Sequence, residues 1–122
     1  MTTAAARTVL RVRALLGRRR NVVERLVMGG HAFMVDGAMC CSVGRAGLLV
    51  RVDDASRDAL LATRHVRPMV LGGRTMRAFV RVAPAGYRTT AALAEWLERG
   101  VRAARSGRRG GPSQRQRRRA RR

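Results

Sequence analysis

One stretch of the sequence decides the fold, and it reads VVERLVMGGHAFMVDGAMCCSV from Val22 to Val43. Two apolar runs in it flank the pair Asp36-Gly37. An Asp-Gly pair in this position is a strong hairpin signal, because a type I′ turn needs positive φ at both central residues. The stretch therefore predicts an antiparallel pair of strands, Val22–Val35 and Ala38–Val43. Within the first of them, Gly29-Gly30 predicts a bulge or a close approach of the backbone.

Further elements follow on both sides of this hairpin. Apolar or alternating runs predict three more strands: Leu48–Val52, Met69–Leu71 and Met76–Val82, the last two joined by a turn at Gly72-Gly73. Helices are expected where apolar residues recur every three or four positions: Thr3–Leu16, Asp54–Ala62 and Ala91–Ala104, the last two capped by Asp53 and Thr90. The sequence therefore predicts a two-layer α+β fold in the order α-β-β-β-α-β-β-α. Its expected architecture is a five-stranded antiparallel sheet with helices on one face.

The composition divides the chain into a domain and a tail. The 122 residues include 27 arginines, no lysine and 7 acidic residues. We expect residues 1–106 to form one domain and residues 107–122 to form a disordered tail. The tail has too little apolar surface to offset the entropy of ordering it. It carries eight arginines and no acidic residue: Arg108, Arg109, Arg115, Arg117, Arg118, Arg119, Arg121 and Arg122.

Arginine at this density predicts contact with the backbone of DNA or RNA. A guanidinium group pairs with phosphate through two hydrogen bonds and stays charged at cellular pH, but phosphate contacts carry no sequence choice. If all eight tail arginines contact phosphates, the slope of log K against log salt should be about −6 to −7. The alternative is that a GC-rich coding sequence produced the arginines and the tail only solubilises the protein.

The strand Met76–Val82 supplies the candidate contacts within the domain. Its alternation places Arg77, Phe79 and Arg81 on one face and Met76 on the other, with Val80 and Val82. An arginine-aromatic-arginine pattern on an open sheet face can stack a base and pair phosphates, so Arg74, Arg77 and Arg81 are predicted to bind nucleic acid. The alternative is a solvated face whose single aromatic lies at a dimer contact.

No pattern in the sequence indicates an enzyme. Cys40 or Cys41 could be paired with His31 or His65 as nucleophile and base, but nothing in the sequence activates the thiol. Strand alternation places the adjacent cysteines on opposite faces, so we expect no disulfide between them. The spacing of these four residues matches no zinc pattern, and we expect no metal or cofactor.

No targeting or membrane segment is apparent either. No stretch approaches the roughly 20 apolar residues that span a bilayer, and the first residues do not form a signal peptide. We therefore expect a cytoplasmic protein without a membrane partner.

Six short motifs occur in order between Leu26 and about Arg105: Gly29-Gly30, Val35–Met39, Leu49–Val52, Arg67–Met69, Gly73–Val80 and Leu93–Gly100. In this order and spacing they resemble the N-terminal domain of the TfoX/Sxy family, bacterial regulators associated with natural competence. The resemblance implies an antiparallel sheet covered by helices and no catalytic residues. The chain departs from the family at Val27-Met28, where the pattern has Met-Phe. An arginine tail also stands where the full-length regulators have a second domain.

These observations predict a non-enzymatic binding protein. By resemblance it is linked to transcriptional regulation, and the tail adds sequence-independent attraction to nucleic acid. The alternative is a protein-interaction module, either a homodimer or a partner of a larger regulator, whose tail only solubilises it.

Overall fold

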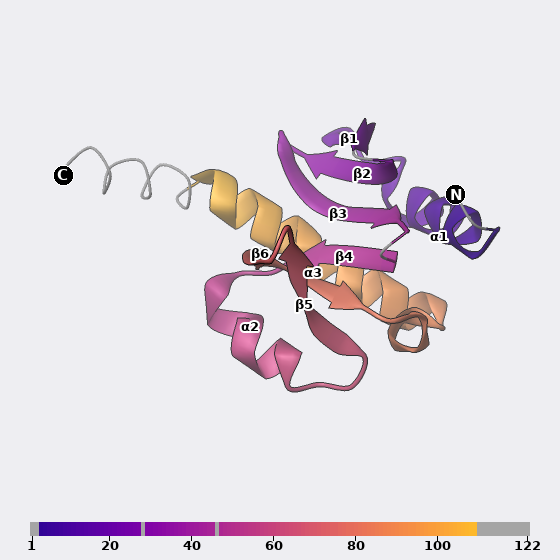
Figure 1. Cartoon of the computed structure of the whole chain (residues 1–122). Coiled ribbons are helices and arrows are strands. Elements are labelled where there is room, and N and C mark those ends of the chain that lie inside the picture. The colour runs from indigo at the N-terminus through magenta and orange to yellow at the C-terminus, as the bar shows by residue number, and fades with distance from the viewer. Residues whose placement is uncertain (1–2, 28, 46, 110–122) are drawn as a thin grey trace.

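The structure is a computed structural model that describes residues 3–27, 29–45 and 47–109, with side chains up to Ser106. One antiparallel sheet with helices packed against it makes up the described chain (Figure 1). The elements in chain order are α1 (Thr3–Leu16), β1 (Val22–Val27), β2 (Gly30–Val35), β3 (Ala38–Gly44), β4 (Gly47–Arg51), α2 (Asp54–Leu61), β5 (Val66–Leu71), β6 (Arg74–Val82), the 3₁₀ helix η1 (Pro84–Tyr87) and α3 (Thr90–Arg109).

The α+β fold with one antiparallel sheet and three helices is confirmed for the described residues, but the prediction of five strands is wrong. The sheet has six strands, in the order β1-β2-β3-β4-β6-β5. The stretch expected to form one strand, Val22–Val35, folds back on itself, and Val27 pairs with Gly30. The reversal depends on Gly29, whose φ of 80° is a conformation that residues with a side chain rarely adopt. The glycine pair therefore forms a hairpin turn rather than a bulge.

The two other predicted hairpin turns are confirmed. Asp36 and Gly37 have φ values of 51° and 87°, as a type I′ turn requires. Gly72 and Gly73 have φ values of 57° and 78° and join β5 to β6. These turns fix the antiparallel pairing because a two-residue loop brings the flanking strands into direct register.

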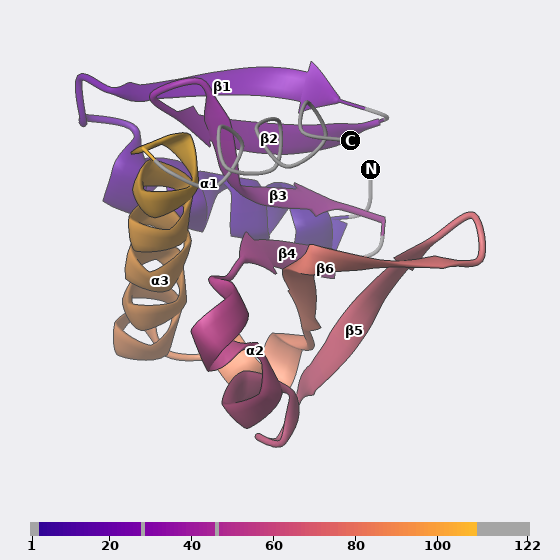
Figure 2. The same ribbon diagram turned by 90° about the vertical axis from the view of Figure 1, so that its left-hand side faces the viewer.

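The hydrophobic core lies between the helices and one face of the sheet. All three helices contribute to the same cluster of buried residues, for example Val12 from α1, Leu60 from α2 and Leu97 from α3. The strands contribute Phe33 and Val50, among others. Figure 2 shows α3 beside the central strands and the β5–β6 hairpin projecting away from it. The opposite face of the sheet is therefore left without a helix in the described chain.

The ends of α3 differ from the prediction. The side chain of Thr89, rather than that of Thr90, caps the helix by accepting a hydrogen bond from the Ala92 backbone N–H at 3.0 Å. The helix backbone then continues to Arg109, past the predicted end at Ala104 and three residues into the predicted tail. The indole N–H of Trp96 donates to the Gly86 carbonyl at 3.2 Å and attaches α3 to η1.

The expectation that Cys40 and Cys41 point to opposite faces is wrong. Phe33 pairs with Cys41 and Met34 pairs with Met39, so Cys40 is an extra residue in β3. Such a bulge interrupts the alternation, and both cysteines lie in the core that the helices cover. Both are free thiols, in agreement with the expectation that they form no disulfide.

A charged group attaches α1 to the edge strand β1. The guanidinium of Arg13 donates two hydrogen bonds to the carboxylate of Glu24, at 2.9 and 2.8 Å. The Nδ1 atom of His31 lies 2.7 Å from the same carboxylate. The hydrogen bond from Arg13, with a smaller contribution from His31, lowers the pKa of Glu24 from 4.5 to about 2. Glu24 therefore stays charged well into the acid range.

This lowered pKa predicts a pH-dependent contribution to stability. A carboxyl group whose pKa is lower in the folded state stabilises the fold above its unfolded pKa and loses that effect as the pH falls through its folded value. We expect Glu24→Gln to be less stable than the wild type at neutral pH. The difference in free energy of unfolding should shrink between about pH 4.5 and pH 2. Urea unfolding at several pH values measures it, and a difference that stays constant over this range would contradict the prediction.

Candidate nucleic-acid interface

The arginines predicted from β6 do not form one cluster. Arg74 begins β6 at the tip of the β5–β6 hairpin, which Figure 2 shows projecting away from α3. Arg77 pairs with Asp54 of α2 at 2.9 Å. Arg81 lies between Leu49 and Arg67 in the sheet, because these residues are its direct partners on β4 and β5. The three side chains therefore have three different surroundings.

An irregularity in the β5–β6 pairing explains why the predicted alternation fails here. Val70 pairs with Thr75 and Pro68 pairs with Val80, so β6 has extra residues between the two pairs. As a result Met76 shares the open face with Phe79, whereas Arg77 turns towards α2. Phe79 is 9% exposed, and the guanidinium of Arg51 lies 4.7 Å from the centre of its ring. Its ring is thus already engaged by a cation.

The predicted tail falls largely outside the described residues. Arg108 and Arg109 belong to the α3 backbone, and nothing is described of their side chains. The remaining tail arginines lie outside the described ranges: Arg115, Arg117, Arg118, Arg119, Arg121 and Arg122. The structure places the end of α3 at Arg109 (Figure 1), and these remaining tail residues follow it in the sequence.

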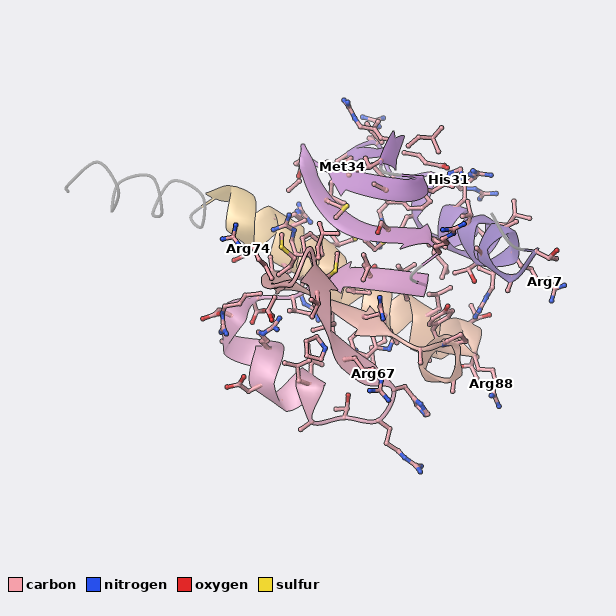
Figure 3. All side chains as sticks on the ribbon, viewed as in Figure 1. Arg7, His31, Met34, Arg67, Arg74 and Arg88 are labelled. Carbon is pink, nitrogen blue, oxygen red and sulfur yellow. The ribbon has the colours of Figure 1, made fainter. Side chains whose placement is uncertain are left out.

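A basic groove lies at the other end of the domain. It has a volume of about 370 Å³ and runs between the start of α1, the β3–β4 turn and η1. Four arginines line it and no acidic residue does: Arg7, Arg11, Arg45 and Arg88. Arg7 and Arg88 appear together at the end of the molecule away from Arg74 in Figure 3. We call this groove, with its four arginines, the basic groove.

Arg11 is held in place at the centre of this groove. Its guanidinium donates to the backbone carbonyls of Tyr87 and Arg88, at 2.8 and 3.2 Å, and lies 5.9 Å from the centre of the Tyr87 ring. Neutral carbonyls orient the group without cancelling its charge. Among the described residues, Arg7, Arg45 and Arg88 have no ion-pair partner. The groove therefore presents a concentrated positive field, which raises the local concentration of polyanions.

Four of the seven acidic residues form ion pairs outside the basic groove. Glu24 pairs with Arg13, Asp54 with Arg77, Glu95 with Arg99 and Glu98 with Arg19. Four arginines of the domain are thus seen to form an ion pair with a carboxylate in the part of the chain that the structure describes, whereas 19 arginines precede residue 107. The excess charge is therefore a property of the folded surface as well as of the composition.

The basic groove is not apparent from the sequence. Arg7 and Arg11 are four residues apart and therefore lie on the same side of α1, which the sequence shows. Arg45 and Arg88 stand alone in a turn and a loop, and nothing local connects them to α1. The contact between Arg11 and Arg88 spans 77 positions of sequence, so only the folded chain brings the groove together.

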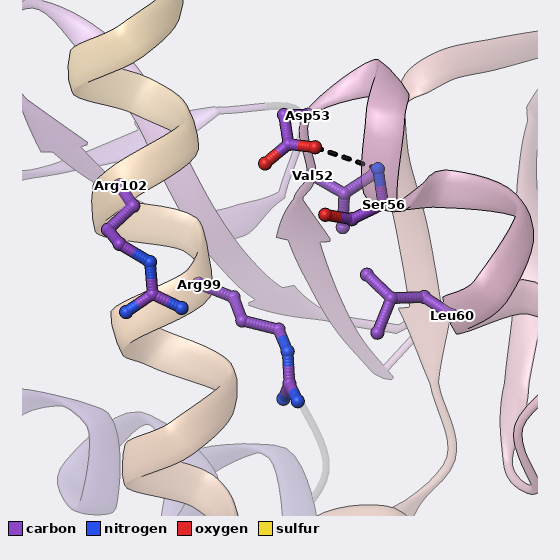
Figure 4. Close-up of a pocket in the computed structure, with 6 residues that line it drawn as sticks. All are labelled: Val52, Asp53, Ser56, Leu60, Arg99 and Arg102. Atoms are coloured by element: carbon purple, nitrogen blue, oxygen red, sulfur yellow. Dashed lines mark hydrogen bonds between the residues drawn. The ribbon is translucent and has the colours of Figure 1, made fainter.

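A smaller hollow of about 130 Å³ lies between α2 and α3 (Figure 4). Asp53 uses one carboxylate oxygen to cap α2, accepting from the Ser56 backbone N–H at 2.8 Å. Across the hollow, Arg99 pairs with Glu95 at 3.4 Å and lies 4.8 Å from the centre of the Trp96 ring. These contacts serve helix packing, and we assign no ligand to this hollow.

The cysteines and histidines are not arranged for nucleophilic chemistry. A side-chain hydrogen bond with Cys40 that favours the protonated thiol, together with burial, raises the pKa of Cys41 well above 9.0. Cys40 is also buried, whereas His65 is exposed and His31 contacts Glu24.

Within the described ranges, no group of three or more histidine, cysteine or acidic residues could hold a metal ion. In the same ranges, no helix has both the length and the apolar composition needed to cross a bilayer.

Comparison with family models shows to which protein family the chain belongs. The model of the TfoX N-terminal domain matches residues 14–104. The chain belongs to this family. No curated protein and no solved structure matched the chain in comparable searches.

The TfoX N-terminal domain match sets the basic features of this chain in context. It includes Arg45 and Arg88 of the basic groove but begins after Arg7 and Arg11. It also ends before the eight arginines of the predicted tail. The basic groove therefore combines the segment matched to the TfoX N-terminal domain with the part of α1 that precedes it.

Proposed function

We propose that this TfoX N-terminal domain protein is a non-enzymatic nucleic-acid-binding protein that contacts the phosphate backbone without sequence choice. The basic groove carries the proposal. Four arginines from α1, the β3–β4 turn and the end of η1 converge there without an acidic residue, and two backbone carbonyls hold Arg11. Guanidinium groups arranged in this way suit phosphate oxygens, which accept two hydrogen bonds from one arginine.

The arginine-rich segment at the C-terminal end would add a second contact. The basic groove lies beside η1, which immediately precedes α3, and the segment continues from the other end of α3. A helix of 20 residues is about 30 Å long, so the two basic regions begin at opposite ends of the domain. One nucleic acid could engage both, and a role in regulation would then follow from where the protein is recruited.

The proposal predicts a steep salt dependence and little sequence preference. Fluorescence anisotropy with two 20-base-pair duplexes of unrelated sequence should give affinities within about threefold of each other, because phosphate contacts carry no sequence information. The double variant Arg7→Gln/Arg88→Gln should reduce the slope of log K against log salt by about 2, since each lost phosphate contact removes about 0.9.

The matched control removes the same charge elsewhere. Arg64 and Arg105 are exposed and lie outside the basic groove, so Arg64→Gln/Arg105→Gln should leave most of the slope intact. A control that weakens binding as much as the groove variant would show that net charge alone acts. Absence of binding to either duplex at low salt would end the proposal.

A further inference from the structure

The face of the sheet opposite the helices has an ordered arrangement of residues. Residues that pair directly across neighbouring strands lie on the same face. One such row crosses all six strands of the described sheet: Arg25, Ala32, Ser42, Leu49, Arg81 and Arg67. Arginines therefore stand at both ends of the row, and small or apolar residues occupy its middle.

Glycines make the middle of this face hollow. Val27 pairs with Gly30, and Gly44 pairs with Gly47. The row of residues next to the one that ends in arginines therefore has a glycine on each of β2, β3 and β4. A Cβ atom added at Gly30 would lie 3.1 Å from the Val43 carbonyl oxygen, and one added at Gly44 would lie 3.2 Å from the Gly30 Cα atom. The backbones approach so closely that only glycine leaves the surface open. A cavity of about 520 Å³ results. We call it the open-face trough.

Apolar side chains form the walls of the open-face trough. Three methionines line it, Met39, Met69 and Met76, and Met76 is 38% exposed. Val27 on one side and Leu71 on the other are 43% and 44% exposed. These residues come from two hairpins, β1–β2 and β5–β6, which both extend to the same side in Figure 2. Methionine adapts its shape readily, and surfaces rich in it are used to bind varied partners.

Arginines border the open-face trough: Arg45 lines it, and Arg25, Arg67 and Arg81 stand in the neighbouring row of the sheet. Arg25, Arg45 and Arg67 have no carboxylate partner among the described residues. The Nε atom of Arg81 is buried and has no hydrogen-bond partner there. A buried donor without an acceptor costs free energy.

The dimensions and charges select one kind of occupant. The three central strands span about 10 Å at 4.7–4.9 Å per strand, which matches the diameter of an α-helix. A second copy of this chain would bring the same arginines into contact, and the arginine-rich C-terminal segment would be repelled too. The ring of Phe79 is covered by Arg51, which removes the platform that a base needs. A bilayer surface is too flat to reach the floor of a trough.

We propose that the open-face trough binds an acidic amphipathic helix of a partner protein. The apolar stripe of that helix lies on the methionines, and its flanking carboxylates pair with Arg25 on one side and with Arg67 and Arg81 on the other. This is the helix-in-groove mode, in which residues at positions i, i+3, i+4 and i+7 act as anchors. The inference does not depend on the proposed nucleic-acid function, because the trough and the basic groove share only the β3–β4 turn.

Three labelled peptides of 18 residues test the inference with the full chain. The first has leucines at helical spacing and glutamates on the flanks, the second has lysines in place of the glutamates, and the third has the composition of the first in scrambled order. We expect the first to bind in the micromolar range by fluorescence anisotropy and the other two to bind at least tenfold more weakly. Equal binding of the first and third peptides, or no binding of the first below 1 mM, would overturn the inference.

Variants then locate the site. Leu71→Ser/Met76→Ser should weaken binding of the first peptide at least tenfold, since both side chains are exposed walls of the trough. The matched control is Leu26→Ser on β1, which pairs with His31 and so lies on the opposite face of the sheet at 76% exposure. Loss of binding in the control but not in the double variant would refute the site.

Oligonucleotide, vesicle and sedimentation measurements separate the other occupants. The double variant should bind the 20-base-pair duplex as the wild type does. If it instead loses binding to the duplex or to phosphatidylglycerol vesicles while keeping the peptide, the trough serves that other ligand and the inference fails. A wild-type dimer in sedimentation that the double variant converts to a monomer would overturn it in favour of a second copy.

Discussion

Removal of residues 110–122 is expected to lower the affinity of the protein for a 20-base-pair duplex by about 100-fold or more at 0.1 M salt. These residues include six arginines and no acidic residue. If between half and all of them contact phosphate, the slope of log K against log salt should become less steep by about 3 to 5. Fluorescence anisotropy over a salt series measures both quantities. The truncation should end at Arg109 rather than at residue 106, because α3 continues to Arg109.

A full-length control separates charge from chain length. In it the six arginines after residue 110 are replaced by glutamine, so the segment keeps its length and loses its charge. We expect this variant to behave like the truncation, since the affinity comes from counterion release. If the truncation and the full-length protein have equal slopes, the segment has no part in binding and its arginines are explained by coding bias. Binding by the domain alone would then rest on the basic groove.

Gly100→Ala is expected to lower the melting temperature by about 5 to 15 °C, corresponding to an overpacking cost of about 1–3 kcal/mol in a domain of this size. Alanine normally stabilises a helix relative to glycine by about 1 kcal/mol, so the expected sign is the reverse of the usual one. The reason is the close contact between α3 and β3. A Cβ atom at position 100 would lie 2.6 Å from the backbone oxygen of Cys40 and 2.9 Å from its sulfur.

The β3 bulge makes this contact rigid. Cys40 is the extra residue of the bulge, and its thiol points at α3, 3.7 Å from the Leu97 carbonyl oxygen. The backbone oxygen cannot move without disturbing the central strand, so α3 must shift instead. Thermal unfolding followed by circular dichroism tests the prediction, with Arg105→Ala on the exposed side of α3 as the control. A Gly100→Ala variant that melts at or above the wild-type temperature would show that the helix yields at little cost.

The basic groove and the open-face trough divide the surface between two kinds of partner. The groove lies at the end of the sheet between α1 and η1, whereas the trough lies on the face that no helix covers in the described chain. Arg45 borders both, because the β3–β4 turn stands at their junction. A protein partner in the trough would therefore change the charge next to the groove, which couples the two surfaces if both proposals hold.

Local patterns in the sequence determined the parts of the fold that local physics governs. The positive φ values at Asp36-Gly37 and Gly72-Gly73 follow from residue type, and the helix Thr3–Leu16 follows from its apolar periodicity. The family motifs are short local stretches too, so the TfoX N-terminal domain was recognisable from the sequence as well. The glycine pair at 29–30 was visible, but its turn was mistaken for a bulge because both structures use glycine.

Only the tertiary structure decided which side chains meet. The register of two strand pairs shifts, at the extra residue Cys40 and between Pro68 and Val70. Each shift changes the face of the sheet to which the neighbouring side chains point, and the alternation of apolar residues in the sequence reveals neither. Such irregularities arise from the packing of strands against each other and against α3. The basic groove likewise depends on Arg11 reaching Arg88 across the fold. Periodicity reports the conformation of one segment, whereas a binding surface depends on contacts between segments that are far apart in the chain.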